Sequence, residues 1–186
     1  MHNINRRGFL KGALYSAGGL VLGTSTLARA AEGFAVAKPT DVHLLTSDAA
    51  ADASFGAGVQ LGLPIYQSVT RHQAGTMELL GTMNRLLQQQ RPMRLIGLVD
   101  DASAELLTAT ARRLGARMSW LARHSADRHQ VRHSAIEGDT SQFDGASQLW
   151  AVHLGHQLAG ARNSNSLNLP QSLRLEGRFV SFVIEV

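Results

Sequence analysis

The chain has 186 residues, of which 44% are hydrophobic and 17% are charged, and it contains no cysteine. This length suits one domain with a single buried core, and this composition belongs neither to a disordered chain nor to a fibre. The missing cysteines exclude disulfides, thiolate nucleophiles, Cys-ligated zinc and ordinary iron–sulfur clusters. A formal net charge of +4 arises from 18 Lys+Arg against 14 Asp+Glu, and only Lys11 and Lys38 among the basic residues are lysine.

A basic motif opens the chain and is followed by a weakly apolar stretch. The stretch, at residues 12–27, is rich in Gly, Ala and Ser and ends in Ala28-Arg29-Ala30. A charged start, an apolar middle and a small-x-small end are the three parts of a signal peptide, here with cleavage expected after Ala30. The key residues of the motif are Arg6, Arg7, Phe9, Leu10 and Lys11.

Residues 5–11 resemble the twin-arginine (Tat) export motif, in which a polar residue and two arginines are followed by any residue, Phe, Leu and Lys. Asn5 stands where that motif more often has Ser or Thr. The resemblance implies recognition by the Tat translocase, folding before export and a periplasmic location. It also implies a kind of cargo that often holds a cofactor or travels with a periplasmic protein partner, such as an exported redox enzyme.

The predicted signal changes how the net charge is interpreted. The chain divides into a signal peptide at 1–30, a leader at 31–40 and a single domain at 41–186. Cleavage removes four of the 18 basic residues and none of the 14 acidic ones, so the mature protein would be formally neutral. We therefore expect no nucleic-acid partner.

No uninterrupted apolar run reaches the roughly 18 residues of a membrane-spanning helix, so we expect no stable membrane span after cleavage.

Apolar periodicity, broken by Gly and Pro, predicts alternating strands and helices in this domain. Met77, Leu80, Met83 and Leu87 recur at helical spacing and predict the buried stripe of one helix. The predicted elements in chain order are a strand at 41–47, a weak helix at 49–62, an extended piece at 63–66, a helix at 74–90, a strand at 93–99, a helix at 102–114, strands at 116–124 and 129–136, a helix at 147–159, and a hairpin at 173–186 that turns at Glu176-Gly177.

The clearest unit is the strand, helix and strand at 93–99, 102–114 and 116–124. The first strand is a continuous apolar run, which is typical of a strand covered on both faces. Two strands joined by such a helix form a parallel pair with a right-handed crossover. We therefore expect an α/β domain with a mainly parallel central sheet and flanking helices, a Rossmann-like arrangement, that ends in an antiparallel hairpin.

Polar side chains follow two of the predicted strands and are candidates for ligand binding. Ser47 and Asp48 follow the first strand, and Asp100 and Asp101 follow the strand at 93–99. Ligands of open parallel sheets bind beyond the carboxyl ends of the strands, where two carboxylates could bind a cation or act as acid and base. The alternative is that Asp101 caps the next helix while Asp100 is solvated.

Histidines provide the candidate metal ligands. Pairing of the strands at 116–124 and 129–136 through a four-residue loop places His124 opposite His129, with their Cβ atoms about 5 Å apart. Such a pair could share a metal ion, although another ligand would have to come from elsewhere. The alternative is a polar hairpin at the edge of the sheet.

A second histidine pair, His153 and His156, lies on one side of the predicted helix at 147–159. Its mean direction is roughly 130° from the stripe formed by Trp150, Leu154 and Leu158, at 100° per residue. If that stripe faces the core, the pair points away from it, so a surface pair is the alternative to a metal site.

Other patterns give little support to hydrolysis or to nucleotide binding. The chain has no Gly-x-Ser-x-Gly elbow. Gly56-Ala57-Gly58 lacks the third glycine and the Lys-Ser/Thr of a phosphate loop, which favours an Ala/Gly-rich packed helix or loop. The densest basic region favours a solvated face or a partner interface over nucleic acid, and it consists of Arg112, Arg113, Arg117, Arg123, Arg128 and Arg132.

Export without a recognisable catalytic constellation favours a periplasmic accessory or binding protein, such as the companion of an exported redox enzyme. The alternative is a small metal-binding protein or metal-dependent hydrolase that uses a histidine pair. The sequence identifies no catalytic residue, and fold alone does not supply a function.

Overall fold

The computed structural model describes residues 41–50, 53–127, 130–138, 149–160 and 175–186. The predicted signal peptide and leader lie outside the described residues. The strands are β1 (Asp41–Ser47), β2 (Val69–Ala74), β3 (Met93–Asp100), β4 (Arg117–Ala126), β5 (Val131–Glu137) and β6 (Gly177–Glu185), and the helices are α2 (Ala53–Gly62), α3 (Thr76–Leu87), α4 (Asp101–Arg113) and α5 (Trp150–Leu158).

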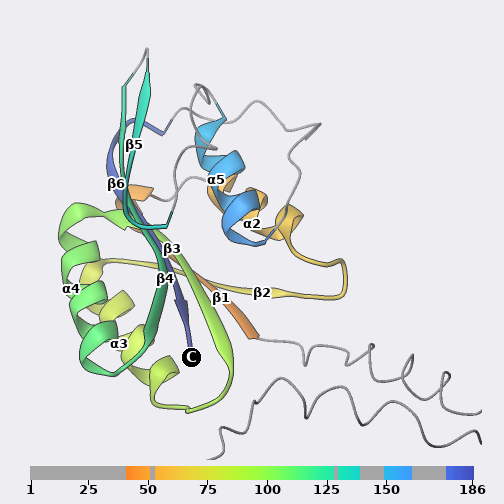
Figure 1. Cartoon of the computed structure of the whole chain (residues 1–186), viewed down its shortest axis with the longest axis vertical. Coiled ribbons are helices and arrows are strands. Elements are labelled where there is room, and N and C mark those ends of the chain that lie inside the picture. Colours follow the sequence, from red (N-terminus) through yellow and green to blue (C-terminus); the bar gives the residue numbers. More distant parts are fainter. Residues whose placement is uncertain (1–40, 51–52, 128–129, 139–148, 161–174) are drawn as a thin grey trace, which may run out of the picture. The chain divides into compact units, whose positions relative to one another are not determined.

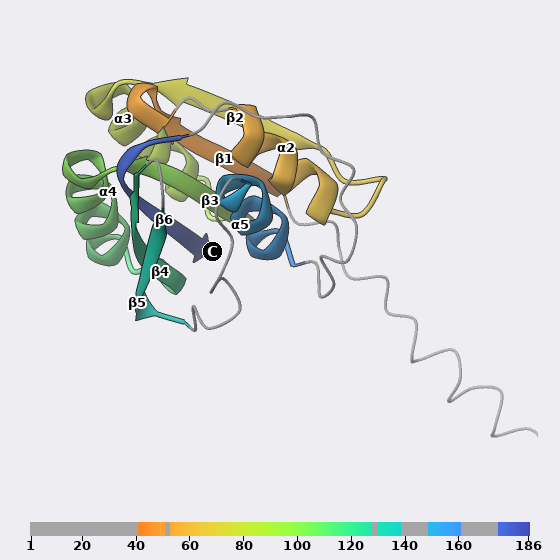
Figure 2. The same ribbon diagram turned by 90° about the horizontal axis from the view of Figure 1, so that it is seen from above.

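The described strands form one mixed sheet in the order β2-β1-β3-β6-β4-β5. The strands β2, β1 and β3 are parallel, whereas β6 is antiparallel to both β3 and β4, and β5 is antiparallel to β4. Helices α2 and α5 cover one face of this sheet, and α3 and α4 cover the other (Figures 1 and 2). The α/β class with flanking helices is therefore confirmed. The expected mainly parallel, Rossmann-like sheet is wrong, because two of the five strand pairs among the described residues are parallel and three are antiparallel.

Two apolar clusters hold the three layers together. One lies between the sheet and α2 and α5, and the other lies between the sheet and α3 and α4. Strand β3 contributes Ile96 and Leu98 to the first cluster and Leu95 and Val99 to the second. Successive strand side chains point to opposite faces, so burial on both faces explains the continuous apolar run.

The expected parallel pair of β3 and β4 is wrong, because β6 lies between them. The two strands still run in the same direction, since each is antiparallel to β6. The predicted C-terminal hairpin is also wrong. Gly177, expected in the turn, already belongs to the continuous strand at 177–185. Residues 173 and 174, expected in the first strand of the hairpin, lie outside the described residues. The crossover through α4 leaves a gap two strand spacings wide, and the apolar strand β6 fills it.

Strand β2 and the buried side of α3 also differ from expectation. The extended piece predicted at 63–66 has no strand structure, and the edge strand begins at Val69. Its polar sequence lacks the apolar alternation of a half-buried strand. In α3, Met83 and Leu87 are buried as expected, but Met77 is 74% exposed.

Helices α2 and α5 pack with their backbones in close contact. A Cβ added at Gly58 would overlap the carbonyl oxygen of Val152, and one added at Gly62 would overlap the carbonyl oxygen of His156. From the other side, a Cβ at Gly155 would overlap the carbonyl oxygen of Phe55. The glycines of α2 therefore serve close helix packing, in agreement with the interpretation preferred from the sequence.

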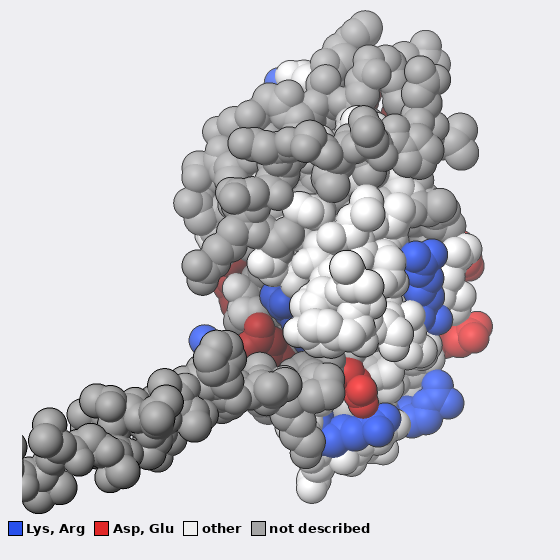
Figure 3. Space-filling model, turned by 90° about the vertical axis from the view of Figure 1, so that its right-hand side faces the viewer, with Lys and Arg blue, Asp and Glu red and all other residues white. Residues whose placement is uncertain are grey.

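Figure 3 shows an area without charged side chains, bordered by Lys or Arg and by Asp or Glu groups. The segment from residue 53 to residue 70 contains no Lys, Arg, Asp or Glu. Its exposed side chains include Leu61, Ile65 and Tyr66. This segment therefore offers no charged group to an ionic ligand.

Candidate functional site: polar residues at the strand ends and an arginine groove

The carboxyl ends of β1 and β3 meet where the direction of the chain connections reverses. From β1 the chain passes through α2, on one face, to β2; from β3 it passes through α4, on the other face, toward β4 (Figure 2). Such a reversal is where ligands bind in open parallel sheets. The structure brings two predicted residues together here, since the backbone N–H of Asp100 donates to Ser47 Oγ at 3.1 Å.

Asp100 and Asp101 have the opposite roles to those considered in the sequence. Asp100 is the N-cap of α4, and Oδ1 accepts from the backbone N–H of Ser103 at 2.9 Å. Its second oxygen, Oδ2, accepts from Ser103 Oγ at 2.8 Å. Asp101 is the first residue of the helix and is exposed. The expectation that Asp101 would be the cap is therefore wrong.

Both carboxylate oxygens of Asp100 are used in hydrogen bonds within the protein. Burial alone would raise the pKa of Asp100, but hydrogen bonds from Ser103 and Ser47 outweigh it, so the pKa lies below its ordinary value. Ser103 is fully buried, and its hydroxyl lies 2.7 Å from Thr76 Oγ1. Asp48 is exposed beside this network. The strand ends thus hold a closed hydroxyl–carboxylate network, in which Thr76 was not anticipated from the sequence.

Strands β4 and β5 pair as predicted but in a different register. His124 lies opposite His133, four residues from the expected partner. His129 lies outside the described residues. The shift arises because β4 continues to Ala126 and moves the turn outward. The predicted pairing of His124 with His129 is therefore wrong, and the even shift, which keeps the same side chains on the same face, places His133 opposite His124 instead.

His124 lies at the centre of a buried hydrogen-bonded chain. Its Nδ1 lies 2.7 Å from Nδ1 of His133, and its Nε2 lies 2.7 Å from Ser181 Oγ. The indole N–H of Trp120 donates to the same Ser181 hydroxyl at 2.7 Å. The ring also packs against Trp150 of α5. Burial, and to a lesser extent the neighbouring His133, lowers the pKa of His124 from 6.5 to about 3.

The hydrogen-bonded side chains around His124 do not have the geometry of a metal site. Both ring nitrogens of His124 are engaged in hydrogen-bonding contacts. The two Nδ1 atoms are also closer than the roughly 3.3 Å that separates two nitrogen ligands of a tetrahedral ion with bonds of about 2.0–2.1 Å. Within the part of the chain that the structure describes, no three His, Cys, Asp or Glu side chains are grouped as a metal site requires.

The pair at His153 and His156 is not a surface pair. His156 is 6% exposed, whereas His153 is partly exposed. The stripe of Trp150, Leu154 and Leu158 is buried as predicted. The close contact with α2 brings a second side of α5 into the interior, which a single-stripe interpretation of the helix could not show.

Another histidine contact was missed from the sequence. His43 Nδ1 on β1 lies 3.2 Å from His72 Nε2 on β2, and the rings are stacked. Burial is the main cause that lowers the pKa of both rings. The contact could not be predicted, because it requires the pairing of β1 with a strand that the sequence pattern did not identify.

Three arginines gather on the sheet face next to α4. Arg178 on β6 and Arg132 on β5 lie on either side of Ser125 on β4, which pairs with both. With strands about 4.8 Å apart, the Cα atoms of the two arginines are about 10 Å apart. Arg123 lies two residues along β4 and pairs with Ser134. The pairing thus places three guanidinium groups and two hydroxyl groups on one small area.

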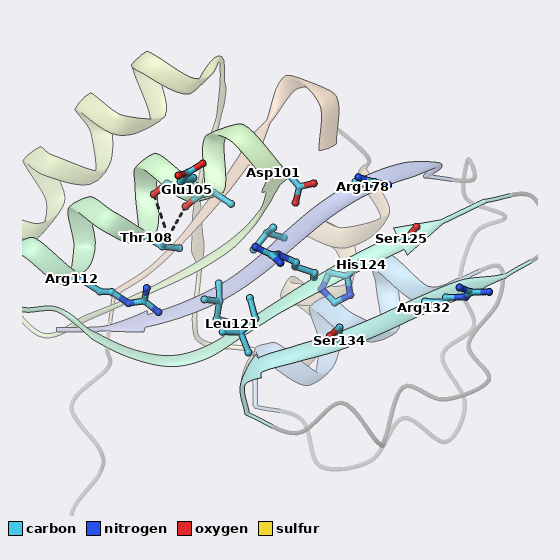
Figure 4. Close-up of a pocket in the computed structure, with 14 residues that line it drawn as sticks. Asp101, Glu105, Thr108, Arg112, Leu121, His124, Ser125, Arg132, Ser134 and Arg178 are labelled. Atoms are coloured by element: carbon cyan, nitrogen blue, oxygen red, sulfur yellow. Dashed lines mark hydrogen bonds between the residues drawn. The ribbon is translucent and has the colours of Figure 1, made fainter.

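These arginines line a groove of about 810 Å³ between the strands and α4 (Figure 4). We call it the arginine groove; its strand wall carries Arg123, Arg132 and Arg178, and its helix wall carries Asp101 and Glu105. Buried side chains that include Ala104, Leu121 and Val180 form an apolar part of its lining.

The three arginines of the strand wall form no ion pair with any described residue. Arg112, which also lines the groove, is different, because its guanidinium lies 2.6 Å from Glu137 Oε1. Three neighbouring arginines without an ion-pair partner attract anions and favour bidentate contacts to carboxylate or phosphate. The sequence showed Arg112, Arg123 and Arg132 within a basic region, but it gave no sign that Arg178 joins them.

Comparisons with protein-family models, with curated proteins and with solved structures give no match for this chain. The described helices include none with the length and apolar character needed to cross a membrane.

Proposed function

We propose that this chain is a Tat-exported periplasmic binding protein that holds a small anionic ligand in the arginine groove. One observation carries the proposal: Arg123, Arg132 and Arg178 surround a groove without an ion-pair partner among the described residues. Guanidinium groups together with the hydroxyls of nearby serines are the donors that oxyanions accept. An accessory role beside an exported enzyme is compatible with such a site.

The export half of the proposal is supported by the sequence. Arg6 and Arg7 occur in the order and context of the Tat motif, and Ala30 ends the small-x-small pattern. The fold is compatible with this route, since two apolar clusters form without any cysteine. A core of this kind needs no oxidising compartment to form, as transport of a folded cargo requires.

The geometry favours anion binding over the alternative of a histidine-bound metal. The two nitrogens of His124 contact Ser181 and His133, whereas the arginine groove presents charged donors to solvent. The guanidinium groups of the arginine groove are therefore accessible to a ligand, and the ring nitrogens of His124 are not.

Calorimetric titration of the purified protein with inorganic phosphate tests the proposal. We expect binding that weakens as ionic strength rises, because the arginines are exposed and screened by salt. Each of Arg123→Gln, Arg132→Gln and Arg178→Gln should weaken binding about tenfold, which is about 1.4 kcal/mol. Arg113→Gln is the matched control, since Arg113 is exposed on α4 and does not line the groove. Binding that is absent, or that survives in all three groove variants, would overturn the proposal.

A further inference from the structure

The arginine groove has two walls of opposite charge. The strand wall carries Arg123, Arg132 and Arg178, and the helix wall carries Asp101 and Glu105. Figure 4 shows Asp101 and Glu105 on α4, across from the strands that carry Arg132 and Arg178. All five side chains belong to exposed residues.

The two walls do not neutralise each other. None of the ion pairs among the described residues, defined by N···O distances of at most 4.0 Å, joins an acid of the helix wall to an arginine of the strand wall. Arg112 does not neutralise the helix wall, because it is paired with Glu137. The separation of charge across the groove is therefore a property of the arrangement.

Each wall also brings like charges together. Asp101 and Glu105 are four residues apart in α4, so they lie on the same side of the helix and repel each other. Arg178 and Arg132 flank the same residue of β4, Ser125, on neighbouring strands. Like charges four residues apart on a helix disfavour folding. The two arginines, whose strands are separated by β4, add to the positive potential of the strand wall. A ligand with both signs of charge would relieve the repulsion on both walls.

Resting on the proposed function, we infer that the ligand is a small zwitterion with an anionic group at one end and an ammonium group at the other. The anionic group lies among Arg123, Arg132 and Arg178, and Ser125 Oγ and Ser134 Oγ are further donors on the same strand wall. The ammonium group lies against the two carboxylates of α4.

The apolar part of the groove fits the carbon chain that joins these two groups. Leu121 and Val180 contribute buried side chains to the lining between the two walls, and Ala104 does so from α4. A pocket with an apolar base and a few convergent polar groups is the usual form of a small-molecule site, in which the polar groups fix the orientation of the ligand.

Two matched probes test the inference. O-Phosphoethanolamine carries a phosphate and an ammonium group, whereas ethyl phosphate carries the phosphate without the ammonium group. We expect the purified protein to bind O-phosphoethanolamine at least about tenfold more tightly than ethyl phosphate by calorimetry. This preference is expected because only the first probe gains contacts to both walls.

The double variant Asp101→Asn/Glu105→Gln should remove this preference while ethyl phosphate, no longer repelled by two carboxylates, binds at least as tightly as before. The control Glu78→Gln removes an exposed acid of α3 that does not line the groove and should leave the preference intact. Equal affinity of the original protein for both probes, or a preference that survives in the double variant, would overturn the inference while leaving anion binding in place. If neither probe binds, the proposed function fails as well.

Discussion

Asp100 and Asp101 are adjacent and chemically identical, and hydrogen bonding gives them different roles. Asp100 accepts from both the backbone N–H and the hydroxyl of Ser103, whereas Asp101 faces solvent on the first turn of α4. The sequence placed both at the start of a helix but could not distinguish them. Which one caps depends on where β3 ends, and element boundaries are the part of a fold that pattern alone fixes least well.

The capping assignment predicts unequal effects of two alanine substitutions. Asp100→Ala removes the acceptor for the Ser103 N–H and should lower the free energy of unfolding by about 1–2 kcal/mol in urea denaturation. Asp100→Asn keeps an acceptor oxygen and should cost less. Asp101→Ala should change stability by no more than about 0.5 kcal/mol. A larger loss for Asp101→Ala than for Asp100→Ala would show that the capping assignment is wrong.

His124 makes the stability of the protein sensitive to acid. Its pKa is about 3 in the folded state and 6.5 as an ordinary value, so the unfolded chain binds more protons between these limits. Stability therefore rises with pH through this window, is complete above about pH 7 and falls as the pH decreases. The loss from pH 8 to pH 5 should be about 2 kcal/mol from this residue.

Urea denaturation at several pH values measures this effect. The slope between pH 4 and pH 6 should be about 1.4 kcal/mol per pH unit shallower in His124→Gln than in the original protein. The lowered pKa values of His43, His72 and His156 act in the same direction in both proteins, so their contributions cancel in the comparison. Equal slopes would contradict a buried, neutral His124.

At the scale of elements, the contact between α2 and α5 depends on residues without side chains. Gly58→Ala places a methyl group against the Val152 carbonyl, and a backbone atom cannot move aside as a flexible side chain can. We expect a loss of about 3 kcal/mol or more in the free energy of unfolding. Gly81→Ala in α3 is the control, since nothing lies within 4 Å of the added Cβ. That variant should gain about 0.5–1 kcal/mol from helix propensity. Similar effects of the two substitutions on thermal unfolding would argue against close helix packing.

The sequence best predicted a strand that is buried on both faces and a helix that is buried along one stripe. The apolar run of β3 and the stripe of Trp150, Leu154 and Leu158 both appear where expected. Strand β2 was missed because it is a polar edge strand. The position of β6 was missed because strand order depends on contacts between distant segments, on which local periodicity carries no information.

The candidate site was less predictable than the fold for the same reason. Arg178 reaches the groove only because β6 is inserted beside β4, and His43 meets His72 only because β1 pairs with β2. Residues that act together through strand order share no local pattern. The strand ends at Ser47 and Asp100 were predicted, because the carboxyl ends of parallel strands meet by geometry alone.

At the scale of the whole molecule, the proposal joins an export route to a binding site. Arg6→Lys/Arg7→Lys should leave the protein in the cytoplasm with its signal peptide intact, because the paired arginines are the feature that the Tat motif requires. Lys38→Gln is the control, since Lys38 lies in the predicted leader beyond the cleavage site. Cell fractionation followed by mass determination measures both location and cleavage. Periplasmic recovery of the double variant at the original level would contradict the Tat route.

Anion binding by the arginine groove can be observed at the arginines themselves. Nitrogen-15 NMR of arginine side chains during titration with inorganic phosphate tests it most directly, because each guanidinium group reports separately. Anion binding in the groove predicts saturable shifts of the Nε resonances of Arg123, Arg132 and Arg178 with one shared dissociation constant, and no such shift for Arg113. Unchanged resonances in the groove, or larger shifts at arginines outside it, would contradict anion binding there.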